Sequence, residues 1–275
     1  MYKPLLITLI SCFLLCGCHH ASRNAHASRD AQRTVSTEPA AQVQNPKKLR
    51  LFLVILDFSS SYADYENVLK SIRAELKDLG PGDRFVLARI PGRLDPKNFV
   101  LIDASTDKPA DEIFTPSKNS NEWHRKTNAL DVAWHQVSES SHTISSVLQK
   151  LEGANTGTRT DLHGAITYGV RWLHSQEAVE PTLIICTDLE HDLGTPTFAP
   201  PATHVDVSDL RVRLLFVTYR NSEHWEKLET EWRKYFDGAA ALEILDSGRS
   251  ADEIFTPSQV PRKLPSLLSN LRSAN

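Results

Sequence analysis

Two short apolar runs, each followed closely by an aspartate, limit what this chain can fold into. Residues 51–56 read Leu-Phe-Leu-Val-Ile-Leu and lead into Asp57, and residues 183–186 read Leu-Ile-Ile-Cys and are followed after one residue by Asp188. A run of this length without polar alternation is typical of a strand buried on both faces, as in a parallel sheet covered by helices. Segments with helical periodicity separate the two runs, so the sequence predicts a layered α/β domain with a mainly parallel sheet.

The other hydrophobic patterns predict where the strands and helices lie. Strands are expected at residues 51–56, 85–90, 99–102, 183–186, 210–217 and 242–245, and helices at 65–79, 122–151, 161–174, 225–236 and 260–271. A turn-rich segment, residues 91–96, joins the second and third strands, which are close enough in sequence to form a hairpin. The serine-rich stretch Ser138–Ser141 is expected to interrupt the long helix at 122–151.

The amino terminus has the pattern of a bacterial export signal. Lys3 precedes an uncharged Leu/Ile-rich run, residues 5–17, whose 13 residues fall short of the roughly 20 needed to span a bilayer. Residues 15–18 read Leu-Cys-Gly-Cys and resemble a lipobox, so cleavage would leave Cys18 as a lipidated first residue. Cys12 ends a second candidate, but that would leave an apolar core of about seven residues, so Cys18 is preferred. An ordinary secretory signal or an uncleaved anchor is the alternative.

Charge and composition separate a tether from a folded domain. Residues 19–48 are rich in Ala, Ser, Gln, Arg and Asn without a hydrophobic period, and are expected to be a disordered tether. This segment has a net charge of +3, from five basic and two acidic residues, whereas residues 49–275 carry −7, from 25 basic and 32 acidic residues. A basic tether can lie along anionic lipid, or its charges can simply keep it solvated. The net charge of the whole chain, −3, does not point to nucleic acid.

Hydroxyl and carboxylate side chains follow the two apolar runs. Asp57, Ser59 and Ser61 occupy alternating positions after the first run, so that they can face one target, and Asp188 follows the second run. A third loop offers Thr160 at the start of a predicted helix. In an open parallel sheet, ligands bind beyond the carboxyl ends of the strands, where these loops are expected to meet. Oxygen donors without cysteine or clustered histidine suit Mg²⁺ or Mn²⁺ better than zinc.

These five residues resemble the metal-ion-dependent adhesion site of the von Willebrand factor A (VWA) domain family. The family pattern is Asp-x-Ser-x-Ser after the first strand, a Thr in a middle loop, and an Asp after the fourth strand. The resemblance covers about residues 49–275, includes residues 79–84 and 160–166, and leaves about 108–141 as a possible insertion. The middle loop has Thr158-Arg159 where the family has paired glycines.

The resemblance implies both a fold and a mode of binding. The fold would be a doubly wound six-stranded sheet with the order 3-2-1-4-5-6, helices on both faces and strand 3 antiparallel at the edge. Asp57, Ser59, Ser61, Thr160 and Asp188 would hold Mg²⁺ or Mn²⁺ directly or through water, and would leave one of six positions open for an Asp or Glu of a protein partner. With the lipid anchor, the expectation is an adhesion or assembly lipoprotein of the bacterial cell envelope, outside the cytoplasm, and not an enzyme.

Two other interpretations of the same residues stay open. Asp57 could cap a helix while the hydroxyls bind turn amides, in a structural VWA-like module that binds its partners without metal. Alternatively, Asp57 could be the nucleophile of a metal-dependent phosphohydrolase, although the haloacid dehalogenase pattern needs an Asp where Ser59 stands. A serine hydrolase would need Gly-x-Ser-x-Gly, which surrounds neither serine.

An exact repeat has no place in this scheme. The octapeptide Ala-Asp-Glu-Ile-Phe-Thr-Pro-Ser occurs at Ala110–Ser117 and again at Ala251–Ser258, each time after a predicted strand. A reused structural joint and a duplicated binding epitope are the two interpretations, and the joint is favoured.

Overall fold

A computed structural model describes residues 50–105, 119–153, 157–177, 180–218, 225–246 and 254–255. The chain divides into two units, Met1–Val43 and Gln44–Asn275, and every described residue belongs to the second. The predicted signal, the lipidation site at Cys18, the tether and the helix at 260–271 lie outside the described residues. The first copy of the octapeptide also lies outside them.

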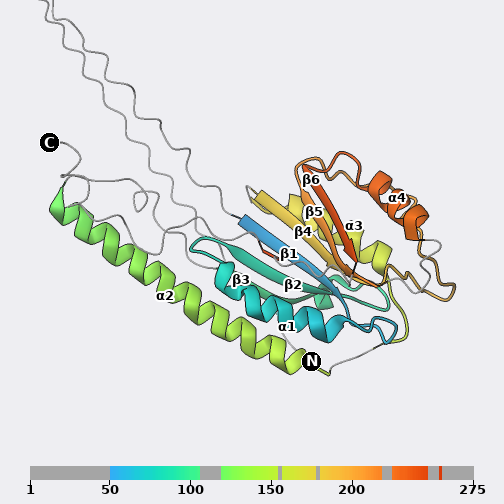
Figure 1. Cartoon of the computed structure of the whole chain (residues 1–275), viewed down its shortest axis with the longest axis horizontal. Coiled ribbons are helices and arrows are strands. Elements are labelled where there is room, and N and C mark those ends of the chain that lie inside the picture. The colour runs from blue at the N-terminus through green and yellow to red at the C-terminus, as the bar shows by residue number, and fades with distance from the viewer. Residues whose placement is uncertain are drawn as a thin grey trace, which may run out of the picture. The chain divides into compact units, whose positions relative to one another are not determined.

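A six-stranded sheet with the order β3-β2-β1-β4-β5-β6 forms the centre of the fold (Figure 1). Only β3, at one edge, is antiparallel to its neighbour, which confirms the predicted order and the predicted hairpin with β2. The strands are β1 (Arg50–Asp57), β2 (Arg84–Ile90), β3 (Val100–Ser105), β4 (Glu180–Cys186), β5 (Arg211–Val217) and β6 (Ala241–Asp246).

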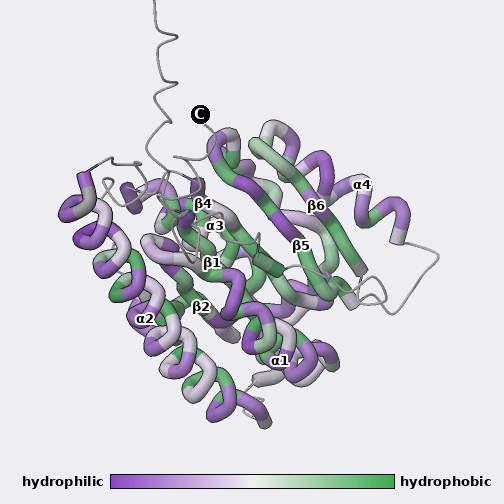
Figure 2. Tube along the Cα trace, turned by 60° about the vertical axis from the view of Figure 1, so that its left-hand side comes forward, coloured by the Kyte–Doolittle hydropathy of each residue, from purple (hydrophilic) through white to green (hydrophobic). Residues whose placement is uncertain are grey.

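The two faces of the sheet bury separate hydrophobic clusters, as expected for strands without polar alternation. Along β1, Leu53 and Ile55 pack on the face covered by α3 (Leu162–His174) and α4 (Trp225–Tyr235). The intervening residues Phe52, Val54 and Leu56 pack on the face covered by α1 (Tyr65–Glu75) and the second half of α2 (Ser120–Leu151). Figure 2 shows the hydrophobic strands between helices whose outer sides are hydrophilic. Helices on both faces confirm the predicted layered architecture.

The shorter helices match their predicted periodicity. The first ends at Glu75 and continues as a 3₁₀ turn, η1 (Leu76–Asp78), before the glycines at residues 80 and 82. A second turn, η2 (Pro96–Asn98), lies in the loop between β2 and β3. Within the described ranges, no helix has the length and apolar character needed to cross a bilayer.

The long helix α2 corrects one prediction. Its 32 residues run without a break through Ser138–Ser141, where an interruption was expected. Serine in a helix costs only about 0.5 kcal/mol relative to alanine. Val137 and Ile144, on either side of the serines, are 4% and 2% exposed, and the burial of these side chains outweighs that small cost. Residues 119–141, which the sequence assigned to a possible insertion, form the cap and the first part of this helix.

Candidate metal centre

The first loop of the candidate site begins where β1 ends. Asp57 is fully buried, and one of its carboxylate oxygens accepts a hydrogen bond from the Ser59 amide at 2.8 Å. The other oxygen accepts a hydrogen bond from the Thr187 hydroxyl, at the end of the neighbouring β4, at 2.9 Å. Ser59 and Ser61 lie with their hydroxyl oxygens 3.0 Å apart. The alternating Asp-x-Ser-x-Ser spacing therefore places the two serine hydroxyls next to each other, with Asp57 hydrogen-bonded to the backbone of the first serine.

The second loop begins where β4 ends, directly beside the first. Asp188 is 6% exposed, and one of its oxygens accepts a hydrogen bond from the Glu190 amide at 3.0 Å. Between them, Leu189 has a φ of 64°, a conformation that residues other than glycine rarely adopt. The Thr187 hydroxyl accepts a hydrogen bond from the Leu189 amide at 3.1 Å and helps to hold this turn. One hydroxyl thus connects the turn after β4 to the Asp57 carboxylate.

The electrostatics of these two loops favour a cation. Burial, and after it the nearby negative charge of Asp188, raise the pKa of Asp57 to about 6, although hydrogen bonds from Ser59 and Thr187 oppose the rise. Two carboxylates close together and shielded from water repel each other when both are ionised. A divalent cation between them would remove that penalty. The residues present therefore fit a bound Mg²⁺ or Mn²⁺ in charge and in donor chemistry.

The third loop, which carries Thr160, is joined to the first by the backbone. Ser59 and Gly157 form an isolated parallel bridge, with the Ser60 amide donating to the Gly157 carbonyl at 3.0 Å. Thr160 is 2% exposed and pairs with Asp192, through hydrogen bonds of 3.0 and 2.8 Å, in the chain that follows β4. The Thr160 loop is therefore fixed on two sides, to the loop after β1 and to the segment after β4.

The five predicted ligands thus lie in three loops around the carboxyl ends of the two central strands, β1 and β4. Their assignment as metal ligands remains a prediction. No group of three or more His, Cys, Asp or Glu side chains in the described part of the chain could hold a metal, so a site here depends on hydroxyl oxygens.

Asp161 supports the candidate site although it is not among the five predicted ligands. Its carboxylate accepts hydrogen bonds from the Gly164 amide at 2.9 Å, as the cap of α3, and from the Leu94 amide at 3.0 Å. Its own amide donates to the Pro91 carbonyl at 2.7 Å. A Cβ added at Gly164 would lie 2.6–2.8 Å from this carboxylate, so glycine keeps the bonds possible. The Asp-x-x-Gly spacing before a helix is a signal for the cap, but not for the contact with the loop between β2 and β3.

A basic cavity of about 300 Å³ adjoins Ser59. Its lining includes Ser59 of the candidate site together with three arginines, Arg89, Arg93 and Arg159, and one acidic side chain, Asp95. Arg93 and Arg159 are exposed, whereas Arg89 donates a hydrogen bond to the Asn98 carbonyl at 3.0 Å. The cavity therefore presents a net positive charge beside Ser59 of the candidate site.

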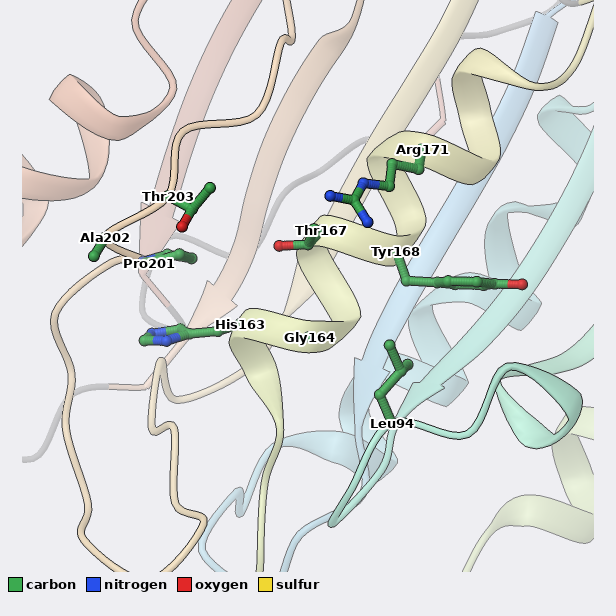
Figure 3. A pocket seen from close by; sticks show the side chains of 9 residues that line it. All are labelled: Leu94, His163, Gly164, Thr167, Tyr168, Arg171, Pro201, Ala202 and Thr203. Atoms are coloured by element: carbon green, nitrogen blue, oxygen red, sulfur yellow. The ribbon is translucent and has the colours of Figure 1, made fainter.

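A second cavity, of about 320 Å³, lies along α3 (Figure 3). Thr167 and Arg171 point from the helix toward Thr203, as the figure shows. At its end, His163 stacks on His191 with ring centres 3.8 Å apart, and His163 Nε2 lies 2.9 Å from the Ala199 carbonyl oxygen. Burial lowers the pKa of His163. These contacts give both rings a structural role in the loop after β4.

No protein-family model and no curated protein matches this chain. Similar solved structures include the pilus adhesin SpaC from Lactobacillus rhamnosus GG in an open conformation, at 13% identity and a TM-score of 0.43, over 74% of this chain and 28% of that one. The ArnB paralog VWA2 from Sulfolobus acidocaldarius has 16% identity and a TM-score of 0.39, over 72% and 42% of the two chains. BatB from Bacteroides thetaiotaomicron has 14% and 0.37, over 71% and 90%. The chain spans less than half the length of the first two.

Similarity at this level concerns the fold and carries no information about a shared site or partner. The observed strand order, the antiparallel edge strand and the helices on both faces make this a VWA-like α/β domain.

Proposed function

We propose that the chain is an envelope-anchored, VWA-like lipoprotein that binds a protein partner through a divalent metal ion. Asp57, Ser59, Ser61, Thr160 and Asp188 would hold Mg²⁺ or Mn²⁺. The observation that carries the proposal is that the three loops with these residues contact one another. The Ser59 amide donates a hydrogen bond to the Asp57 carboxylate, and Ser59 forms a β-bridge with Gly157 of the Thr160 loop. Among the described residues, these loops carry two buried carboxylates and three hydroxyl side chains, and they lie beyond the carboxyl ends of the strands, where open parallel sheets bind ligands.

The donor set favours a site with an open position. Mg²⁺ prefers six oxygen ligands in near-octahedral geometry, and five side chains leave one position for another oxygen. A bound ion there would attract a carboxylate even though the domain as a whole is acidic. We therefore propose that the partner contributes an Asp or Glu side chain to the metal.

The basic cavity supports the same kind of partner. Ser59 lines the cavity together with Arg93 and Arg159, so an acidic segment placed over the metal would also pass these guanidinium groups. Arginine forms charge-assisted hydrogen bonds with carboxylates, often through two parallel contacts. A partner with several acidic residues near the metal-binding one would therefore fit better than a partner with a single isolated carboxylate.

The anchor is proposed from the sequence alone. Lipidation at Cys18 would hold the domain at a membrane through a tether of about 30 residues, residues 19–48. Multiple acyl chains give stable anchoring where one chain gives only marginal binding. The domain would then meet its partner in the cell envelope, outside the cytoplasm, either in the periplasm or at the cell surface.

A metal-dependent phosphohydrolase is the second candidate function, and the geometry of Asp57 disfavours it. A carboxylate nucleophile must itself reach phosphorus, whereas Asp57 is fully buried and both of its oxygens accept hydrogen bonds. Holding an ion through a water molecule, as in the proposed metal site, does not require that approach. We expect no phosphatase activity with or without Mg²⁺. Metal-dependent turnover of an aryl phosphate that is lost in Asp57→Ala would favour the enzyme instead.

Metal-dependent capture of a partner tests the proposal. The chain is immobilised and exposed to solubilised envelope proteins in Mg²⁺ or in EDTA, with an Asp57→Ala, Ser59→Ala double variant alongside. Ser60→Ala is the matched control, because Ser60 is exposed and lies between the two motif serines. We expect a partner that is captured in Mg²⁺ by the wild type and by the control, but not in EDTA or by the double variant. A partner that stays bound in EDTA and to the double variant would show that the module binds independently of metal.

A further inference from the structure

The second copy of the octapeptide is inserted into the core. Its central residues, Ile254 and Phe255, are fully buried. The Phe255 ring packs edge-on against Phe52 of β1, with ring centres 5.2 Å apart, and against Phe85 of β2, at 5.7 Å. Both aromatic partners lie near the amino-terminal ends of their strands, whereas the candidate metal centre lies at the carboxyl ends.

Charged side chains bind the backbone of this segment. The Glu75 carboxylate, at the end of α1, accepts hydrogen bonds from the amides of Ile254 and Phe255, the latter at 3.2 Å. Arg213 of β5 donates to the Ile254 carbonyl and is itself paired with Glu243 at 2.6 Å. Hydrogen bonds to ionised groups are stronger than neutral ones. We call Phe52, Glu75, Phe85 and Arg213 the Ile-Phe dock.

The dock recognises features that the other copy shares. It binds two side chains and three backbone groups of an Ile-Phe pair, and the same pair lies within an identical octapeptide at Ile113 and Phe114. Contacts made by identical residues have the same intrinsic free energy. The difference in affinity between the two copies therefore depends only on how each is connected to the dock.

The connections of the two copies are closely matched. β3 and β6 are the two edge strands of the sheet, and each isoleucine is the eighth residue after the end of its strand, Ser105 for Ile113 and Asp246 for Ile254. Ala104 pairs with Phe85 of the dock itself. Eight residues can extend over about 27 Å, so the first copy can reach the dock from Ser105. Short connections of this kind give effective concentrations in the millimolar range.

We propose that the Ile-Phe dock is a binding site for this octapeptide sequence, and that Ala110–Ser117 is its second ligand, binding in place of Ala251–Ser258 within the same chain. One dock and two equivalent ligands give the domain two alternative docked states. Occupation by the first copy releases the second copy, together with the residues that follow it, from the core. This inference does not depend on the metal centre.

A double-mutant cycle on the full chain tests the proposal. Removal of one of two equivalent ligands halves the number of docked arrangements, so Phe114→Ala and Phe255→Ala should each lower the Tm by only about 1–2 °C. The combined variant leaves the dock without an aromatic ligand and should lower the Tm by on the order of 10 °C. Phe198→Ala is the control, since Phe198 is exposed and outside the dock. The non-additivity is the expected signature.

Hydrogen exchange gives a direct view of the replacement. In Phe255→Ala, the amides of Ile113 and Phe114 should become protected as they take over the Glu75 carboxylate. If Phe255→Ala alone costs as much as the double variant, and Phe114→Ala costs nothing, the dock binds the second copy only and the proposal is wrong. Two large, additive losses would mean two separate sites. Protection that rises with protein concentration would place the first copy of another chain in the dock and would overturn binding within one chain.

Discussion

Stabilisation by metal is the sharpest consequence of the proposed site. An ion that binds only the folded chain stabilises it by RT ln(1 + [L]/Kd), which is about 2.7 kcal/mol at a concentration 100 times the Kd. For a domain of this size, 1 kcal/mol corresponds to roughly 2–4 °C in Tm. We therefore expect saturating Mg²⁺ or Mn²⁺ to raise the Tm by roughly 5–10 °C, and Asp57→Ala to abolish the rise.

The buried charge of Asp57 leads to a second prediction, in which a substitution raises the Tm of the metal-free protein. Its folded-state pKa is about 6, against an ordinary value of 3.8 for aspartate, so folding disfavours the ionised form. At 1.36 kcal/mol per pKa unit, ionised Asp57 costs the metal-free fold about 3 kcal/mol at neutral pH. Asp57→Asn removes that cost and should raise the Tm of the metal-free protein while abolishing the response to metal. A damaged fold would lower the Tm instead.

Differential scanning fluorimetry of the full chain in EDTA and in a series of metal concentrations measures both effects. Ser60→Ala should respond to metal as the wild type does, because the Ser60 side chain is exposed and Ser60 is not one of the five predicted ligands. An unchanged wild-type Tm at millimolar Mg²⁺ and Mn²⁺ would refute the site. A metal-dependent rise that survives in Asp57→Asn would place the ion elsewhere.

Three other changes have defined outcomes. The rise in Tm caused by Mg²⁺ should shrink between pH 7.5 and pH 5, because below its pKa of about 6 Asp57 binds a proton in competition with the ion; equal rises at the two pH values would contradict this. Gly169→Ala places a Cβ 2.7 Å from the end of the buried Ile55 side chain and should cost about 1–3 kcal/mol by overpacking, measured by urea denaturation, where an unchanged midpoint would show that the core can yield. Cys18→Ser should stop lipid labelling and release the chain to the soluble envelope fraction; if Cys12→Ser does so instead, the predicted cleavage site is wrong.

Much of the fold follows from local patterns in the sequence. The apolar run at 51–56 predicts a strand buried on both faces, and β1 has residues of that run packed alternately into the two clusters. The period of the segment at 65–79 likewise identifies the buried face of α1, and the turn-rich residues 91–96 identify the hairpin. These signals succeed because each depends on the spacing of residues that are near one another in the chain.

Contacts between residues far apart in the chain could not be predicted from local patterns. Propensity alone suggested a break at Ser138–Ser141, but the burial of Val137 and Ile144 decides the helix. Nothing in the sequence around Asp161 indicates that its carboxylate accepts a hydrogen bond from the amide of Leu94, which lies 67 positions away in the chain. The octapeptide was visible as a repeat, whereas the burial of Ile254 and Phe255 depends on side chains from four separate elements.

Backbone strain and like charges are found at the carboxyl ends of the strands, whereas the amino-terminal ends have paired charges. At the carboxyl ends of the strands, Asp57 lies near the like charge of Asp188. Leu189 and Phe216, also at these ends, have positive φ values of 64° and 55°. Such features each cost folding free energy and persist only where the surrounding structure holds them. At the amino-terminal ends of the strands, oppositely charged side chains form ion pairs, as Arg50 does with Asp83. Strained residues and like charges that gather at one place in an otherwise consistent fold are expected at a functional site, so their position at the carboxyl ends of the strands supports the proposed metal centre.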